Sequence, residues 1–88
     1  MAAGSIKVLY FAWLRERVGV AEEDVEPPEG VGTVGALQDW LRGRSDRHAA
    51  ALVTGTTVRC AVNQEFAGPD AAVGAGDEVA FFPPVTGG

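Results

Sequence analysis

The hydrophobic period of this chain changes twice, and that change limits the possible folds more than any other feature. Apolar residues alternate along residues 6–12, which is typical of a β-strand. Between residues 33 and 43 they recur every three or four positions, as on one face of a helix. Alternation returns at residues 57–62 and 78–82. This order predicts an α+β domain in which a helix packs across one face of a mixed sheet.

Capping and turn residues predict where the elements begin and end. Thr33 is a suitable N-cap for the long helix, and Gly43 is a suitable stop. A short helical segment over residues 13–18 should end at Gly19, and a second one, reaching residue 53, should begin at Ser45. The acidic segment 22–29 is predicted to contain a short strand that ends at Pro27-Pro28, because proline cannot donate a hydrogen bond to a strand ladder. Three turns are predicted, at residues 63–65, 68–70 and 74–77.

The chain is too short, and too poor in catalytic side chains, for most self-contained enzymes. Its 88 residues suffice for one domain, and they include one Cys and one His. These two residues can form neither an internal disulfide nor a four-ligand zinc site, so no metal site is predicted. The net charge of -5 argues against a nucleic-acid partner. No segment has the roughly 20 apolar residues that span a bilayer, and signal-peptide features are missing, so we expect a cytoplasmic protein.

Several other features receive structural rather than catalytic interpretations. Residues 30–35 match a dinucleotide-binding pattern, but the preceding strand and the later acidic residue that such a site needs are missing. Cys60 shares the strand phase of two neighbouring valines, so we expect it to be a buried small residue. His48 lies among charged residues and alanines and is expected at the surface. The acidic residues of segment 22–29 are expected to form a solvated face.

Three phenylalanines are candidates for an exposed partner-binding surface. Phe11 has the same strand phase as Lys7, and Phe82 has the same phase as Glu78, so each ring shares a sheet face with a charge. Phe66 lies in or beside a turn. A contiguous apolar patch at a surface often marks a binding site. The alternative is that a second packing layer covers some of these rings.

The C-terminal sequence is the strongest functional signal. The dipeptide Pro83-Pro84 should end the last strand and extend the chain, which divides the protein into a domain, residues 1–82, and a tail, residues 83–88. The tail reaches at most ~20 Å beyond the fold. It ends in Gly87-Gly88, which have no Cβ, so it can thread a narrow channel in another protein. Its carboxylate would need activation there, for example as an acyl-adenylate, by machinery that belongs to the partner.

Three segments, residues 6–12, 61–65 and 76–88, carry a resemblance to a known family. Thr33-Val34 with Leu37, and Ser45-Asp46-Arg47, agree with it as well. Together they resemble the small subunit of molybdopterin synthase over nearly the whole chain. The C-terminal block, which reads Phe-Phe-Pro-Pro-Val-Thr-Gly-Gly, is highly specific.

The resemblance implies a ubiquitin-like β-grasp fold and a sulfur carrier that is not itself an enzyme. In that family an adenylyltransferase similar to ubiquitin-activating enzymes uses ATP to adenylate the terminal glycine, and the adenylate is converted to a thiocarboxylate. The tail then enters the large synthase subunit and gives its sulfur to cyclic pyranopterin monophosphate in molybdenum cofactor biosynthesis. The implied partners are the activating enzyme, a sulfur donor protein and the large subunit, in a heterotetramer of two small and two large subunits. No permanently bound cofactor is implied.

The resemblance also assigns roles to residues by position. Gly88 would bear the sulfur, and Gly87 would give the tail slim access. The candidates for partner binding are the three phenylalanines and the rest of the tail: Phe11, Phe66, Phe82, Pro83, Pro84, Val85 and Thr86. Two alternatives share the Gly-Gly end, namely a sulfur carrier for thiamine synthesis and a ubiquitin-like modifier attached to target lysines. A free-standing enzyme lacks a convincing active site in this sequence.

Overall fold

The computed structural model describes residues 5–52 and 58–84. The chain forms eight helices and strands in these two segments, and strands occur at both ends of the order. The elements are β1 (Ile6–Tyr10), α1 (Trp13–Val18), β2 (Glu22–Val25), α2 (Val34–Arg42), α3 (Asp46–Ala51), β3 (Arg59–Val62), β4 (Glu65–Ala67) and β5 (Glu78–Phe82).

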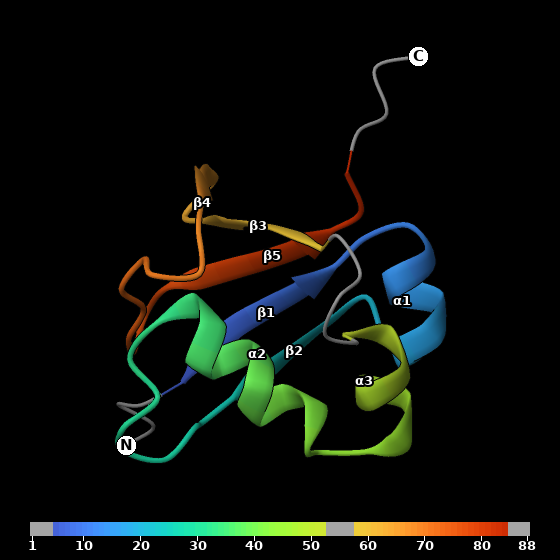
Figure 1. Ribbon diagram of the computed structural model, residues 1–88, viewed down its shortest axis with the longest axis horizontal. Helices are drawn as coiled ribbons and strands as arrows, with labels where there is room; N and C mark the ends of the chain where they lie inside the picture. Colours follow the sequence, from blue (N-terminus) through green and yellow to red (C-terminus); the bar gives the residue numbers. More distant parts are fainter. Residues whose placement is uncertain (1–4, 53–57, 85–88) are drawn as a thin grey trace.

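The five strands form one mixed sheet with the order β2-β1-β5-β3-β4. The parallel pair β1–β5 lies at its centre, with Lys7 opposite Glu78 and Tyr10 opposite Phe81, and every other pair is antiparallel. Strands from near the two ends of the chain therefore lie side by side in the middle of the sheet (Figure 1). This arrangement confirms the predicted α+β class, the mixed sheet and the β-grasp fold.

The core lies between the helices and one face of the sheet. Val8, Tyr10 and Phe81 point from the central strands into this layer, and each has an exposed fraction of 1% or less. Leu37 and Leu41 of α2 are completely buried against them, because apolar residues three and four positions apart share one helix face. The long helix therefore packs across one sheet face, as the sequence predicted.

Helix ends follow the predicted caps. The Thr33 Oγ1 atom accepts a hydrogen bond of 3.2 Å from the Ala36 N–H at the start of α2. Gly19 ends α1 with a φ of 98°, a left-handed conformation that glycine adopts without steric cost, and donates its N–H to the Arg15 carbonyl. Ser45 caps α3 as predicted, through a 3.1 Å bond from the His48 N–H.

The structure also corrects several boundaries. β1 ends at Tyr10 rather than Ala12. β2 covers Glu22–Val25 and so ends two residues before Pro27-Pro28, the dipeptide predicted to stop it. A three-residue strand, β4, begins at Glu65, where the sequence analysis placed the end of a turn. Such a short strand carries too few residues for alternation to reveal it, and only its pairing with β3 defines it.

His48 is buried, so its predicted place at the surface is wrong. Its Nε2 atom lies 2.7 Å from Glu23 Oε2, and its Nδ1 atom lies 2.7 Å from Ser45 Oγ. The Tyr10 hydroxyl donates a second hydrogen bond of 2.7 Å to the same Glu23 oxygen. The prediction that Glu23 belongs to a solvated acidic face is therefore wrong. Partners from α3 and β1 compensate the burial of both polar side chains.

No helix in the described part of the chain is long and apolar enough to cross a membrane.

Candidate functional site

The open face of the sheet, on the side away from the helices, carries the three predicted phenylalanines. Phe66 has an exposed fraction of 84% and Phe11 one of 48%, while Phe82 is half-buried. These values confirm that Phe11 and Phe66 are exposed, and that Phe82 is partly exposed. No second packing layer of described residues covers this face.

Strand register explains why the open face is apolar. Leu9 lies opposite Ala80, Ala80 lies opposite Ala61, and Ala61 lies opposite Phe66. Residues directly opposite one another in a sheet point to the same face, so these four form one row across four strands. Phe82 follows Ala80 by two positions and thus lies on the same face.

Two of the predicted rings are in contact. The ring centroids of Phe66 and Phe82 are 5.8 Å apart, with the ring planes tilted by 49°. Ala61 and Ala80 are small, so the Phe66 ring can reach across β3 toward β5 without obstruction. This aromatic pair at the edge of the row gives a partner a large apolar contact area.

Phe11 lies at the end of β1, beside the end of β5. Its N–H donates a 3.1 Å hydrogen bond to the Phe81 carbonyl, which continues the parallel ladder by one residue. The next residue, Ala12, has a φ of 56° and begins the turn into α1. That turn leaves the Phe11 side chain exposed instead of covered by the following helix.

Three small or aliphatic members of this surface were missed by the sequence analysis. Leu9, Ala61 and Ala80 are each partly exposed between the phenylalanines. Their alternation with buried neighbours was visible in the sequence, but which of the two phases faces the helices was not. We call Leu9, Phe11, Ala61, Phe66, Ala80 and Phe82 the open-face patch.

Charged residues border the open-face patch. The Lys7 ammonium lies 3.7 Å from a Glu22 carboxylate oxygen at one side, and both side chains are about half exposed or more. Arg59 is exposed opposite Phe82 on β3. An apolar centre with a charged border is typical of a protein-binding surface.

The predicted tail begins directly at the end of this patch. The chain leaves β5 after Phe82 and continues away from the sheet through Pro83 and Pro84, both half-exposed (Figure 1). The other predicted tail residues, Val85, Thr86, Gly87 and Gly88, lie outside the described residues.

Cys60 does not provide a reactive sulfur in this structure. It is buried as predicted, and its thiol donates a 3.1 Å hydrogen bond to the Ala67 carbonyl. Burial raises the pKa of the thiol above its ordinary value, which disfavours the nucleophilic thiolate. Among residues 5–52 and 58–84 there is also no group of three side chains suited to hold a metal ion.

The open-face patch can therefore bind a protein, but none of its side chains can act as an acid, a base or a nucleophile. Its six residues are all aliphatic or aromatic, so the contacts that they offer a partner are apolar.

Comparison with known proteins places the chain in a family. The ThiS family matches residues 8–88. A molybdopterin synthase sulfur carrier subunit from Escherichia coli is 48% identical over 83 residues, which are 94% of this chain and 99% of that protein. A protein of the same description from Haemophilus influenzae is 40% identical, with the same coverage.

Solved structures agree with the sequence comparisons. SAMP1 from Haloferax volcanii has a TM-score of 0.76 and 34% identity, covering 97% of this chain and all of that one. A putative molybdopterin converting factor subunit 1 from Pyrococcus furiosus has a TM-score of 0.75 and 34% identity, covering 92% of this chain and 98% of that one. The chain therefore belongs to the ThiS family of ubiquitin-like β-grasp proteins, and within it resembles the sulfur carrier subunits of molybdopterin synthase.

Proposed function

We propose that this protein is the sulfur carrier subunit of a molybdopterin synthase. The observation that carries the proposal is the similarity, over nearly the full length of both proteins, to sulfur carrier subunits from several organisms. The Gly87-Gly88 end supports it, because a C-terminal carboxylate on a slim tail can reach into a partner that activates it. In this role the chain is a sulfur donor and not a catalyst.

The proposed chemistry takes place at the carboxylate of Gly88. A carboxylate oxygen attacks the α-phosphorus of ATP, and pyrophosphate leaves, which gives an acyl-adenylate. A persulfide of a donor protein then attacks the acyl carbon and AMP leaves, which gives an acyl disulfide. A thiol reduces this disulfide: the S–S bond breaks, the thiocarboxylate is released, and the thiol forms a new disulfide with the donor. The thiocarboxylate sulfur then bonds to a carbon of cyclic pyranopterin monophosphate and displaces an oxygen substituent from it. Water finally cleaves the acyl–sulfur bond, which leaves the sulfur on the pterin and restores the Gly88 carboxylate. Gly87 lets the chain pass through a narrow channel, because it has no side chain.

The open-face patch gives these reactions their specificity. A partner seated on Phe11, Phe66 and Phe82 would receive the tail directly from the end of β5, because Pro83 follows Phe82 in the chain. The proposed partners are the large synthase subunit and an adenylyltransferase similar to ubiquitin-activating enzymes. Both must recognise the same carrier, so both are expected to contact this patch.

Intact-mass spectrometry tests the proposal directly. The protein is incubated with ATP, an activating enzyme and a sulfur donor, and the expected product has one oxygen replaced by one sulfur at the C-terminus. Addition of the large subunit and the pterin precursor should restore the original mass as the sulfur is transferred. If neither change occurs with partners that are active on their own carrier, the proposal is wrong.

A deletion of Gly88 is the matched control. It removes the reacting carboxylate from its position and leaves the core residues unchanged, so we expect a folded protein that donates no sulfur. Sulfur donation by this variant would contradict the mechanism.

A second candidate function is attachment to other proteins. It is favoured by the 32% identity and TM-score of 0.73 to a Haloferax volcanii structure described as small archaeal modifier protein 1. Activation at Gly88 would be shared, but the acyl group would then pass to a target lysine. Isopeptide-linked remnants of this chain on cellular proteins would support that function.

Transfer of sulfur to a thiamine precursor instead of the pterin would support the thiamine pathway.

A further inference from the structure

The outer edge of β4 is an unpaired edge of the sheet. β4 is the last strand in the order β2-β1-β5-β3-β4, and no other strand of the described residues pairs with its outer side. An unpaired edge presents backbone N–H and C=O groups that can bond to another chain.

The hydrogen bonds of β3 determine the direction of the backbone groups in β4. The Asn63 N–H, directly after β3, donates a 2.8 Å bond to the Glu78 carbonyl at the start of β5. Backbone groups of successive strand residues point to alternate sides, so those of Val62 and Cys60 point toward β4. Their partners are Glu65 and Ala67.

The N–H and C=O groups of Phe66 therefore point outward. Phe66 lies opposite Ala61, whose own backbone groups face β5, so the Ala61–Phe66 pair is a non-hydrogen-bonded pair. No backbone bond to Phe66 from outside the strand ladders occurs among the described residues. Among the large apolar residues of the described segments, Phe66 has the most exposed side chain, and it also offers two free backbone groups.

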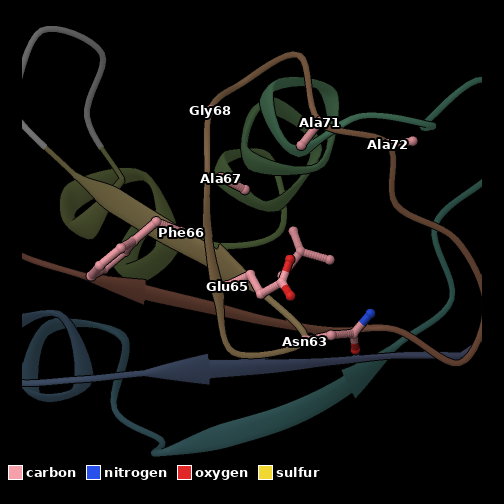
Figure 2. Close-up of a pocket in the computed structure, with 8 residues that line it drawn as sticks. Asn63, Glu65, Phe66, Ala67, Gly68, Ala71 and Ala72 are labelled. Atoms are coloured by element: carbon pink, nitrogen blue, oxygen red, sulfur yellow. The ribbon is translucent and has the colours of Figure 1, made fainter.

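The two sides of β4 offer different surfaces to an added strand. Phe66 and Ala67 leave β4 on opposite sides, with Phe66 pointing to the open-face patch (Figure 2). On the Ala67 side lies a shallow groove of about 640 Å³ whose lining includes Ala71, Ala72 and the Glu65 carboxylate (Figure 2). A strand added here would place alternate side chains against Phe66 and into this groove.

We propose that an extended segment of the large synthase subunit pairs with β4 and exchanges two backbone hydrogen bonds with Phe66. This inference rests on the proposed function and names the contact that the partner makes. The Phe66 side chain belongs to the open-face patch, so a protein that covers the patch reaches this edge at the same residue. Glu65 lies at the groove, so a basic residue of the added segment fits there, whereas a second copy of this chain brings another net charge of -5.

Amide hydrogen exchange tests this pairing in the unmodified protein. The Phe66 amide should exchange quickly in the free carrier, because no described group accepts a bond from it. In the complex with the large subunit, its exchange should slow by about tenfold or more. The same exchange rate in free and bound carrier would overturn the inference. Slowing in the free carrier as its concentration rises would overturn it too, in favour of self-pairing.

The variants Phe66→Pro and Phe66→Ala form a matched pair. Both remove the aromatic ring, but only proline removes the N–H, and an edge strand tolerates proline where its N–H points outward. We expect Phe66→Pro to bind the large subunit about fivefold more weakly than Phe66→Ala, which is the effect of one lost hydrogen bond. Equal affinities would contradict the pairing. If Phe66→Pro does not fold, amide exchange on the wild-type protein decides alone.

The outcomes also separate the two proposals. A wild-type carrier that transfers sulfur to the large subunit while its Phe66 amide stays unprotected would overturn the pairing and leave the proposed function intact. A wild-type carrier that does not bind the large subunit would overturn both.

Discussion

Glu23 shows how the role of a single residue depends on partners far away in the sequence. Its carboxylate accepts hydrogen bonds from Tyr10 on β1 and His48 on α3, at 2.7 Å each. Burial alone would raise the pKa of Glu23, but these hydrogen bonds outweigh it and lower the pKa below its ordinary value of 4.5. Burial also raises the pKa of Tyr10, and the bond to Glu23 adds to that shift.

The lowered pKa of Glu23 predicts acid-dependent stability. A carboxylate with a lower pKa in the folded state stabilises the fold fully above its unfolded-state pKa, and this contribution is lost as the pH falls through the folded-state pKa. We therefore expect the difference in unfolding free energy between wild type and Glu23→Gln to be largest near neutral pH, and to shrink below about pH 4.5. Urea denaturation at several pH values measures it.

Two comparisons isolate the contribution of Glu23. Asp77 also has a lowered pKa, because the Asn63 amide and the Gly74 N–H donate hydrogen bonds to it, but wild type and variant share this contribution. Glu26→Gln, in the exposed part of the same acidic segment, should change stability little at any pH. A difference for Glu23→Gln that stays constant from pH 7 to pH 3 would contradict the argument.

Gln64 occupies a strained position in the turn between β3 and β4. Asn63 and Gln64 have φ values of 51° and 72°, as in the two-residue hairpin turns that favour Asn-Gly. A left-handed conformation costs a residue with a Cβ about 1–2 kcal/mol. Gln64→Gly should therefore raise the unfolding free energy by about 0.5–1 kcal/mol, while Gln64→Ala, which keeps the Cβ, should give no such gain. Equal stabilities of the glycine and alanine variants would contradict this strain.

At the scale of elements, α3 depends on its first residues more than on its length. It has only six residues, so intrinsic helix stability is small. Ser45 Oγ accepts the His48 N–H and also lies 2.7 Å from His48 Nδ1, which links the helix cap to the side chain that bonds Glu23. The cap of α3 and its attachment to β2 are thus one hydrogen-bonded unit.

This linkage predicts that Ser45 and Glu23 are energetically coupled. Ser45→Ala should lower the unfolding free energy by about 1 kcal/mol, the usual cost of a lost N-cap. In a double-mutant cycle with Glu23→Gln, we expect a coupling energy of about 0.5 kcal/mol or more, because both residues orient the His48 ring. The control is Thr33→Ala, which removes the cap of α2 and should combine additively with Glu23→Gln. Additivity for Ser45→Ala as well would show that the two contacts are independent.

Strand β5 places two phenylalanines next to each other with opposite roles. Phe81 is completely buried against Tyr10, with ring centroids 6.3 Å apart, while Phe82 lies half-buried on the open face. Successive strand residues point to opposite faces, so one of the pair stabilises the fold and its neighbour is free to bind a partner.

Substitution of these two rings should therefore have different effects: one on the stability of the fold and the other on partner binding. Phe81→Ala should lower the unfolding free energy by about 3–5 kcal/mol, as expected for a fully buried ring. Phe82→Ala should cost about 1 kcal/mol or less in stability but weaken binding to the large subunit by about tenfold or more. Denaturation and calorimetry of binding measure the two effects. A Phe82 variant that loses stability without losing affinity would assign this ring to the core.

At the scale of the whole molecule, the net charge and the apolar surface affect binding at different distances. The net charge of -5 acts over a distance, whereas the open-face patch acts only on contact. Among residues 5–52 and 58–84 there is no group of three side chains suited to hold a metal ion, and Cys60 is buried.

This difference in range predicts that salt changes the association rate more than the dissociation rate. The association rate with a partner should fall by about tenfold between low and high salt, because screening weakens electrostatic steering. Phe66→Ala should mainly raise the dissociation rate and leave the salt dependence unchanged. Stopped-flow or surface-plasmon kinetics at several ionic strengths would test this. A salt dependence that disappears in Phe66→Ala would contradict the separation.

Local chemistry is sufficient to predict the three helices, the central strands β1 and β5, and the caps at Thr33, Gly19 and Ser45, because each depends on residues close together in the chain. The tail, residues 83–88, stays a prediction from its own sequence. Local patterns also identified both phases of β1 and β5, since side chains in a strand alternate wherever the strand lies.

Which phase of each strand faces the helices depends on the folded structure, because the two faces of a strand differ only in what packs on them. The burial of His48 could not be predicted from local sequence either, because its partner Glu23 is 25 residues away in the chain. β4 and the outward direction of the Phe66 backbone groups follow from the pairing of β4 with β3. The sequence of three residues alone does not reveal with which strand they pair.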